Sequence, residues 1–125
     1  MIEIGKVIYN ILSSATGVTS SVGTRMFPLV APSDTAFPLI VYDRRSNPND
    51  TKDDSLLYQT SVEITILDAD YADGIEIALE VQQALEYYSG TNSGITVRKI
   101  KLIGVDEQYS DDAYVQKLSF MVISV

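Results

Sequence analysis

The sequence predicts an α+β fold, with an antiparallel or mixed sheet of about five strands and two amphipathic helices on one face. Two segments space their apolar residues as helices do, and several others alternate apolar and polar residues as strands do. The predicted order of elements is α-β-β-β-α-β-β. Since strands and helices do not alternate regularly along the chain, a doubly wound parallel sheet is disfavoured.

The chain has 125 residues, which is the usual size of one domain, so residues 1–125 are expected to form a single unit. Hydrophobic residues make up 46% and charged residues 21%, a balance typical of globular domains. No apolar run approaches the roughly 18 residues that a transmembrane helix needs. The apolar N-terminal segment contains Glu3, Lys6 and Asn10, which argue against a signal peptide.

Histidine and cysteine are both absent. The chain therefore lacks the commonest general base, the commonest metal ligand and any thiol for disulfides or nucleophilic attack. Its formal net charge is −8 and its pI about 4.3. Direct binding to nucleic acid or to an anionic membrane is disfavoured, because both depend on cationic side chains. We expect no catalytic residues, no cofactor and no metal.

The first helix is expected from Ile2 to about Ala15, because apolar residues recur on one face. These residues are Ile4, Ile8, Ile11, Leu12 and Ala15. Gly17 is the expected C-terminal cap, and Thr16 to Ser21 the expected polar connector.

The second helix is expected from about Tyr71 to Tyr88, with Asp70 as its N-cap and Gly90 at its end. Its predicted buried stripe contains every third or fourth residue along the segment. The stripe consists of Ile77, Ala78, Val81, Leu85 and Tyr88.

Five strands are expected. The first two are Arg25 to Phe27 and Pro38 to Tyr42, the second covered on both faces because it is continuously apolar. The next, Leu57 to Leu67, places Tyr58, Thr60, Val62, Ile64 and Ile66 on one face. The last two are Ile95 to Val105 and about Tyr114 to Ser124, with Leu118, Phe120 and Val122 on one face. An acidic, turn-like connector, Asp106 to Asp112, is expected between them.

The stretch from Val22 to Tyr42 has the most distinctive pattern. It begins with a Val-Gly pair, an arginine and an aromatic residue followed by proline. A loop that contains proline comes next, and then a proline that precedes hydrophobic residues ending in Val-Tyr. The residues are Val22, Gly23, Arg25, Phe27, Pro28, Pro32, Pro38, Ile40, Val41 and Tyr42. This pattern resembles the tail-terminator, or tail-completion, proteins of long-tailed bacteriophages, and the order of elements agrees over nearly the whole chain.

The resemblance implies a structural virion protein of the tail-neck region, assembled in the bacterial host cytoplasm. It implies a ring, commonly hexameric, that docks on the last ring of the tail tube, stops its polymerisation and joins the neck of the filled head. The implied partners are further copies of the chain, the tail-tube protein and a head-tail connector protein. Gly23, Arg25, Pro28, Pro38 and Tyr42 are then structural, with Arg25 in an ion pair.

An acid cluster near the second helix invites a metal hypothesis. It contains Asp68, Asp70, Asp73, Glu76 and Glu80. The cluster does not match a calcium-binding EF-hand loop, however. Ala72 stands where such a loop has its third ligand, Asp73 stands where it has glycine, and Leu79 stands where it has the final glutamate. Helix capping and a solvated acidic face are therefore favoured.

Two groups of residues are candidates for protein contacts. The loop that joins the strands ending near Tyr42 and starting near Leu57 is predicted to be the tip of a long hairpin, reaching the tube or an adjacent subunit. Its candidate residues are Arg44, Arg45, Asn49, Asp50, Lys52, Asp53 and Asp54. Tyr109 and Tyr114 flank the acidic connector and are either interface residues or locally packed.

Other functions remain open from the sequence. One is a different neck or tube component, such as a head-closure or tube protein. A small hydrolase that uses carboxylates or a metal, and a monomeric binding module, are further alternatives. The absence of histidine weighs against the hydrolase.

Overall fold

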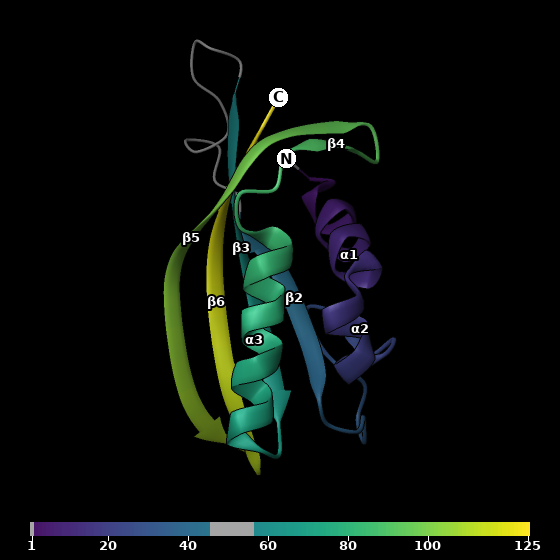
Figure 1. Cartoon of the computed structure of the whole chain (residues 1–125), viewed down its shortest axis with the longest axis vertical. Helices are drawn as coiled ribbons and strands as arrows, with labels where there is room; N and C mark the ends of the chain where they lie inside the picture. Colours follow the sequence, from purple (N-terminus) through teal and green to yellow (C-terminus); the bar gives the residue numbers. More distant parts are fainter. Residues whose placement is uncertain (1, 46–56) are drawn as a thin grey trace.

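The computed structural model describes residues 2–45 and 57–125, which form a six-stranded sheet with its helices on one face (Figure 1). The helices are α1 (Ile4–Ser14), α2 (Thr16–Val22) and α3 (Tyr71–Leu85). The strands are β1 (Met26–Pro28), β2 (Leu39–Arg45), β3 (Tyr58–Asp68), β4 (Gly90–Asn92), β5 (Ile95–Ser110) and β6 (Ala113–Ser124). The predicted α+β class is right, but the predicted order misses α2 and β4.

The sheet is mixed, with the strand order β1-β2-β3-β6-β5-β4. β1 and β2 are parallel, and every other neighbouring pair is antiparallel. β2 and β3 form the arms of the predicted hairpin. The predicted tip of this hairpin lies outside the described residues.

The core lies between the helices and one face of the sheet. β3 and β6 contribute the alternate residues that the sequence predicts, among them Ile64 and Phe120, both fully buried. Opposite them, α3 buries Ile77, Val81 and Leu85. Each such side chain contributes about 1.5–3 kcal/mol when it leaves water, so this contact dominates the stability of the fold.

The connector predicted after the first helix is wrong, because residues Thr16–Val22 form α2. Ala15 adopts an extended conformation that breaks the helix, and the chain then turns so that Val18 and Val22 are fully buried. Gly17 is no cap: it lies inside α2, where an added Cβ would meet the side chain of Glu80. Gly23, with a φ of 60°, ends α2 instead.

The start of α3 is confirmed and its predicted end is wrong. The carboxylate of Asp70 accepts a hydrogen bond from the Asp73 N–H at 3.1 Å, as an N-cap does. The helix ends at Leu85, since Tyr87 has a φ of 65° and reverses the chain. Gly90 therefore caps nothing and begins β4.

The predicted connector from Asp106 to Asp112 is also wrong. β5 continues to Ser110, and only Asp111 and Asp112 form the turn to β6. Their φ angles are 54° and 65°, the left-handed values that a tight two-residue hairpin turn requires.

In the stretch from Val22 to Tyr42, Arg25 forms hydrogen bonds with backbone carbonyls in place of the expected ion pair. Its Nε donates to the Pro38 carbonyl at 2.8 Å, and its Nη2 donates to the Ser21 carbonyl at 3.3 Å. The side chain thus ties the end of α2 to the start of β2. In β2, Leu39 and Ile40 are buried, whereas Val41 and Tyr42 are only half-buried, so full coverage of this strand is wrong.

Two leucines of α3 provide a matched test of the core. Leu85 is fully buried and Leu79 is 46% exposed. Leu85→Ala should lower the free energy of unfolding by about 2–5 kcal/mol, because it removes a buried side chain and leaves a cavity. Leu79→Ala should change it by about 0.5 kcal/mol or less. Urea denaturation followed by circular dichroism measures both, and equal losses would contradict the described packing of α3.

Candidate interaction site

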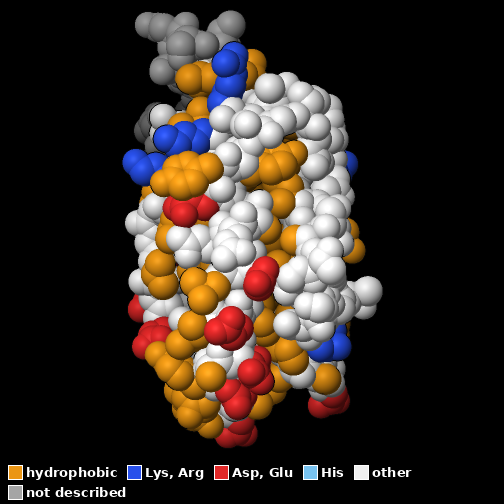
Figure 2. Space-filling view, in the orientation of Figure 1, with side chains coloured by type: hydrophobic (Ala, Val, Ile, Leu, Met, Phe, Trp, Pro, Cys, Tyr) orange, Lys and Arg blue, Asp and Glu red, His pale blue; other side chains and the backbone are white. Residues whose placement is uncertain are grey.

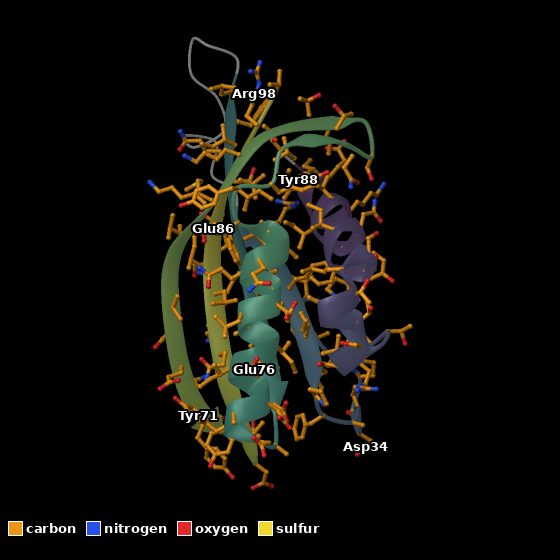
Figure 3. The ribbon with its side chains drawn as sticks, in the orientation of Figure 1. Asp34, Tyr71, Glu76, Glu86, Tyr88 and Arg98 are labelled. Atoms are coloured by element: carbon orange, nitrogen blue, oxygen red, sulfur yellow. The ribbon has the colours of Figure 1, made fainter. Side chains whose placement is uncertain are left out.

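Three tyrosines meet at the turn end of the β5–β6 hairpin, and we call Tyr71, Tyr109 and Tyr114 the tyrosine cluster. Tyr109 and Tyr114 are partners across the two strands, with ring centroids 4.9 Å apart. Tyr71, the first residue of α3, packs edge-on against Tyr114 at 5.5 Å. Figure 3 shows Tyr71 at the lower end of the molecule, opposite Arg98. Tyr109 and Tyr114 therefore pack locally, and their part in a protein interface stays a prediction.

The exposure of the cluster is high for aromatic side chains: 44% for Tyr71, 61% for Tyr109 and 37% for Tyr114. The cluster is fixed by Glu107, whose carboxylate accepts hydrogen bonds from the Tyr71 hydroxyl at 3.0 and 3.2 Å. The Gln116 amide donates to the same carboxylate at 3.1 Å. Ordered, exposed tyrosines lose little side-chain entropy on binding, which makes them suitable for a protein interface.

The hydrogen bond to Glu107 raises the pKa of the Tyr71 phenol above its ordinary value of 10.0, and the negative charge of Glu107 adds to this effect. The cause is that a neutral hydroxyl donates to the carboxylate, whereas a phenolate would repel it. Tyr71 is therefore neutral at physiological pH and acts as a donor.

Charge is unevenly distributed along the long axis of the protein. On the face that Figure 2 shows, most of the acidic side chains lie in the lower half and most of the basic ones in the upper half. The acids near the tyrosine cluster come from the start of α3 and the β5–β6 hairpin. They are Asp70, Asp73, Asp106, Glu107, Asp111 and Asp112. Because like charges repel, this end disfavours contact with an acidic surface.

Of the predicted hairpin residues, Arg44 and Arg45 are described, and they lie at the opposite end from the tyrosine cluster. Arg44 and Arg45 are exposed at the end of β2, and the Arg44 Nε donates to the Ile2 carbonyl at 3.1 Å. The remaining predicted residues lie outside the described part of the chain. They are Asn49, Asp50, Lys52, Asp53 and Asp54. The structure therefore does not bring Arg44 and Arg45 together with Tyr109 and Tyr114.

The acid cluster at the start of α3 has a capping role. Asp68 accepts a hydrogen bond from the Asp70 N–H at 3.0 Å, and Asp70 in turn caps the helix. Within residues 2–45 and 57–125, no three histidine, cysteine, aspartate or glutamate side chains are placed to hold a metal ion. In the same residues, no helix is long and apolar enough to cross a membrane.

Tyr42 lines a groove of about 520 Å³ beside α1. Its ring lies 6.2 Å from that of Tyr9, at a tilt of 40°. Burial raises the pKa of Tyr42, and the neighbouring Tyr9 adds to the effect. Tyr42 also packs against the core, which agrees with the structural role predicted for it.

Sequence reasoning missed Tyr71, Glu107 and Gln116. Tyr71 was expected only as the first residue of a helix, and Glu107 only as part of a solvated turn. Their contact requires α3 and β5 to lie side by side, which is a tertiary arrangement. The only available signal was local, namely that Asp70 as N-cap fixes where Tyr71 begins the helix.

The phenol of Tyr71 provides a test of the cluster. Glu107→Gln should lower the pKa of Tyr71 towards 10.0, because the charged acceptor is lost. Titration followed by NMR of the tyrosine ring carbons measures the change. Glu80→Gln, a neutralisation elsewhere on α3, should leave the pKa of Tyr71 in place. An unchanged pKa in Glu107→Gln would show that the phenol does not bond to this carboxylate.

No protein-family model and no curated protein matches the chain. Solved structures do resemble it. A chain described as "Virion of native gene transfer agent (GTA) particle" is 17% identical, with a TM-score of 0.79, and the match covers 94% of this chain and 90% of that chain. A second solved structure is 9% identical, with a TM-score of 0.61, over 100% of this chain and 96% of that one. At these identities the likeness shows a shared fold.

Proposed function

We propose that this protein is a structural component of a phage-derived virion that caps the tail tube as a ring. In this role it ends polymerisation of the tube and forms the surface that joins tail to head. The observation that carries the proposal is the shared fold, at a TM-score of 0.79, with a chain from a gene transfer agent virion. The match spans nearly all of both chains, so the likeness concerns the whole domain.

The tail-terminator role itself rests on the pattern from Val22 to Tyr42. The structure gives several of these residues backbone-shaping roles: Gly23 ends α2, Arg25 bonds to the Pro38 carbonyl, and Pro28 pairs with Tyr42. Residues that shape the backbone are those a fold-level motif should contain. Within this proposal the chain is not an enzyme.

A ring requires contacts between two unlike surfaces that repeat until the ring closes. The unlike charge of the two ends of the protein is compatible with such contacts (Figure 2). We propose that further copies of the chain, the tail-tube protein and a head-tail connector protein are its partners. The protein would thus lie at the neck of the virion, without direct contact to nucleic acid or membrane.

The second candidate is another neck or tube component, such as a head-closure or tube protein. The similar structure is described by its particle, a gene transfer agent virion, and not by its component, so its fold is equally compatible with another neck or tube protein. The two roles differ in what the purified protein builds. A tube protein extends into long stacks, whereas a terminator stops at a ring.

Negative-stain electron microscopy of the protein, alone and mixed with the tail-tube protein of the same phage, tests the proposal. We expect rings at the ends of tubes and shorter tubes as the amount of added protein rises, because each bound ring blocks further addition. Serum albumin at equal concentration is the control for crowding. Long tubes built by the protein alone would favour the tube-protein alternative, and tubes of unchanged length with bare ends would refute the terminator role.

A further inference from the structure

The lower part of β5 is an unpaired edge of the sheet. β4 pairs with β5 only over Ile95 to Val97. Beyond that point β5 continues to Ser110, and no strand in the described parts of the chain pairs with its outer side. Figure 1 shows this part of β5 at the margin of the sheet, away from α1 and α2.

The upper section of this edge is covered by the end of α3. The carbonyl of Ile100 accepts a hydrogen bond from the Tyr87 N–H at 2.7 Å. The N–H of Leu102 donates to the Glu86 carboxylate at 3.4 Å. The backbone groups of Ile100 and Leu102 therefore point away from β6, and the residues that follow α3 occupy them.

The same alternation identifies the outward groups farther down. Ser110 and Ala113 close a two-residue hairpin turn, so they form a hydrogen-bonded pair of the ladder. The backbone N–H and C=O of Ser110 thus face β6, and those of the residue before it, Tyr109, face outward. The same outward direction recurs at every second residue toward the start of β5, namely at Glu107 and Val105.

The bulge between Leu102 and Gly104 does not upset this result, because the pairing of β6 with β3 is uninterrupted. Val122 of β6 is the partner of Ile100. Its backbone N–H and C=O point to the same side of β6 as those of Leu118, Gln116 and Tyr114, because all four residues are separated by even numbers of positions. These three are the partners of Val105, Glu107 and Tyr109. The upper and lower ends of β5 thus give the same assignment.

Among the described residues no strand or helix covers this lower edge, and its two charged residues, Asp106 and Glu107, are both negative. Asp106 shields one donor, since its carboxylate accepts from the Glu107 N–H at 3.0 Å. The outward N–H groups of Val105 and Tyr109 meet no acceptor among the described residues. The side chains of Val105 and Tyr109 are 63% and 61% exposed. The edge therefore offers backbone groups next to apolar surface.

A second copy of the chain does not fit this edge. Antiparallel pairing of two copies over Val105 to Tyr109 would centre on Glu107 and bring the two Glu107 carboxylates face to face. The other edge strand, β1, has 3 residues and ends in Pro28, so it offers little to pair with. The charge of the edge instead calls for a basic partner.

We propose that the edge from Val105 to Tyr109 binds an extended, basic segment of another protein by strand addition. The side chains of Val105 and Tyr109 lie on the helix side of the sheet, whereas Asp106 lies on the other side. The segment would therefore alternate apolar residues, packed against Val105 and Tyr109, with lysine or arginine residues facing Asp106. Cations at its end can also bind the faces of the tyrosine cluster. This inference goes beyond the proposed function, since any virion component could use such an edge.

The probe is an acetylated peptide of about seven residues, the length of a short strand, in which lysine and valine alternate. It is titrated into ¹⁵N-labelled protein and followed by amide NMR. We expect saturable shifts along residues 103–110 and at the tyrosine cluster, and at least about tenfold slower hydrogen exchange at the Val105 and Tyr109 amides, because these donors gain acceptors. A peptide with N-methyl groups on one face of its backbone should not bind, and a peptide with glutamate in place of lysine should bind at least about tenfold more weakly.

Val105→Pro removes one outward donor without touching the ladder to β6, and should weaken peptide binding at least about tenfold. Proline at Leu79 would break α3, so a proline control there is unsuitable. A second pair of variants therefore uses lysine: Val105→Lys is compared with Leu79→Lys, and both replace an exposed apolar residue. Only Val105→Lys should lose binding, while both keep the melting temperature and amide spectrum of the folded protein.

Three results of the peptide titration would overturn the proposal. They are no saturable binding at millimolar peptide, equal binding of the N-methylated peptide, and shifts confined to other elements. A dimer in light scattering without peptide, with protected Val105 and Tyr109 amides, would assign the edge to a second copy and refute the basic partner. The microscopy of tube ends does not depend on any of these results, so the two proposals fail separately.

Discussion

The pairing of β3 with β6 is the constraint on which the rest of the structure depends. The 11 residues of β3 pair with β6 without a single shift in register. Because side chains alternate along a strand, this register places the apolar residues of both strands on one face. It also fixes which backbone groups of β6 face β3 and which face β5. The core and the free edge of β5 are thus consequences of the same ladder.

The helices cover only part of the face that this ladder presents. α3 packs on β3 and β6, and α1 and α2 lie beside it over β2 (Figure 1). The lower half of β5 extends past this cover, so Val105 is exposed although its partner Leu118 is buried. The bulges in β5 lie above this section, between Val97 and Lys99 and between Leu102 and Gly104. A strand that leaves the core in this way is available to other proteins.

The parts of the fold that bury one face could be predicted from the sequence, and the exposed parts could not. β3, β6 and α3 alternate or repeat apolar residues, and Asp70 marks the start of α3 by a local bond. α2 was missed because only Val18 and Val22 of its residues are buried, within a polar segment. The end of β5 was missed because neither face is buried there, so no alternation records its conformation. Tyr109 and Tyr114 could be proposed from their position, whereas Tyr71 joins them only through tertiary contact.

The chain shares its fold with a chain of a virion particle although only 17% of the residues are identical. A contact between proteins is kept over such sequence divergence only if it depends on few particular side chains. A catalytic site needs particular side chains, and this sequence has neither histidine nor cysteine. A contact made by strand addition depends first on backbone groups, which every residue except proline supplies in full. Its side chains need only keep a charge sign and an apolar alternation. An assembly protein built on such an edge can therefore change most of its surface residues while the edge still pairs with a partner strand.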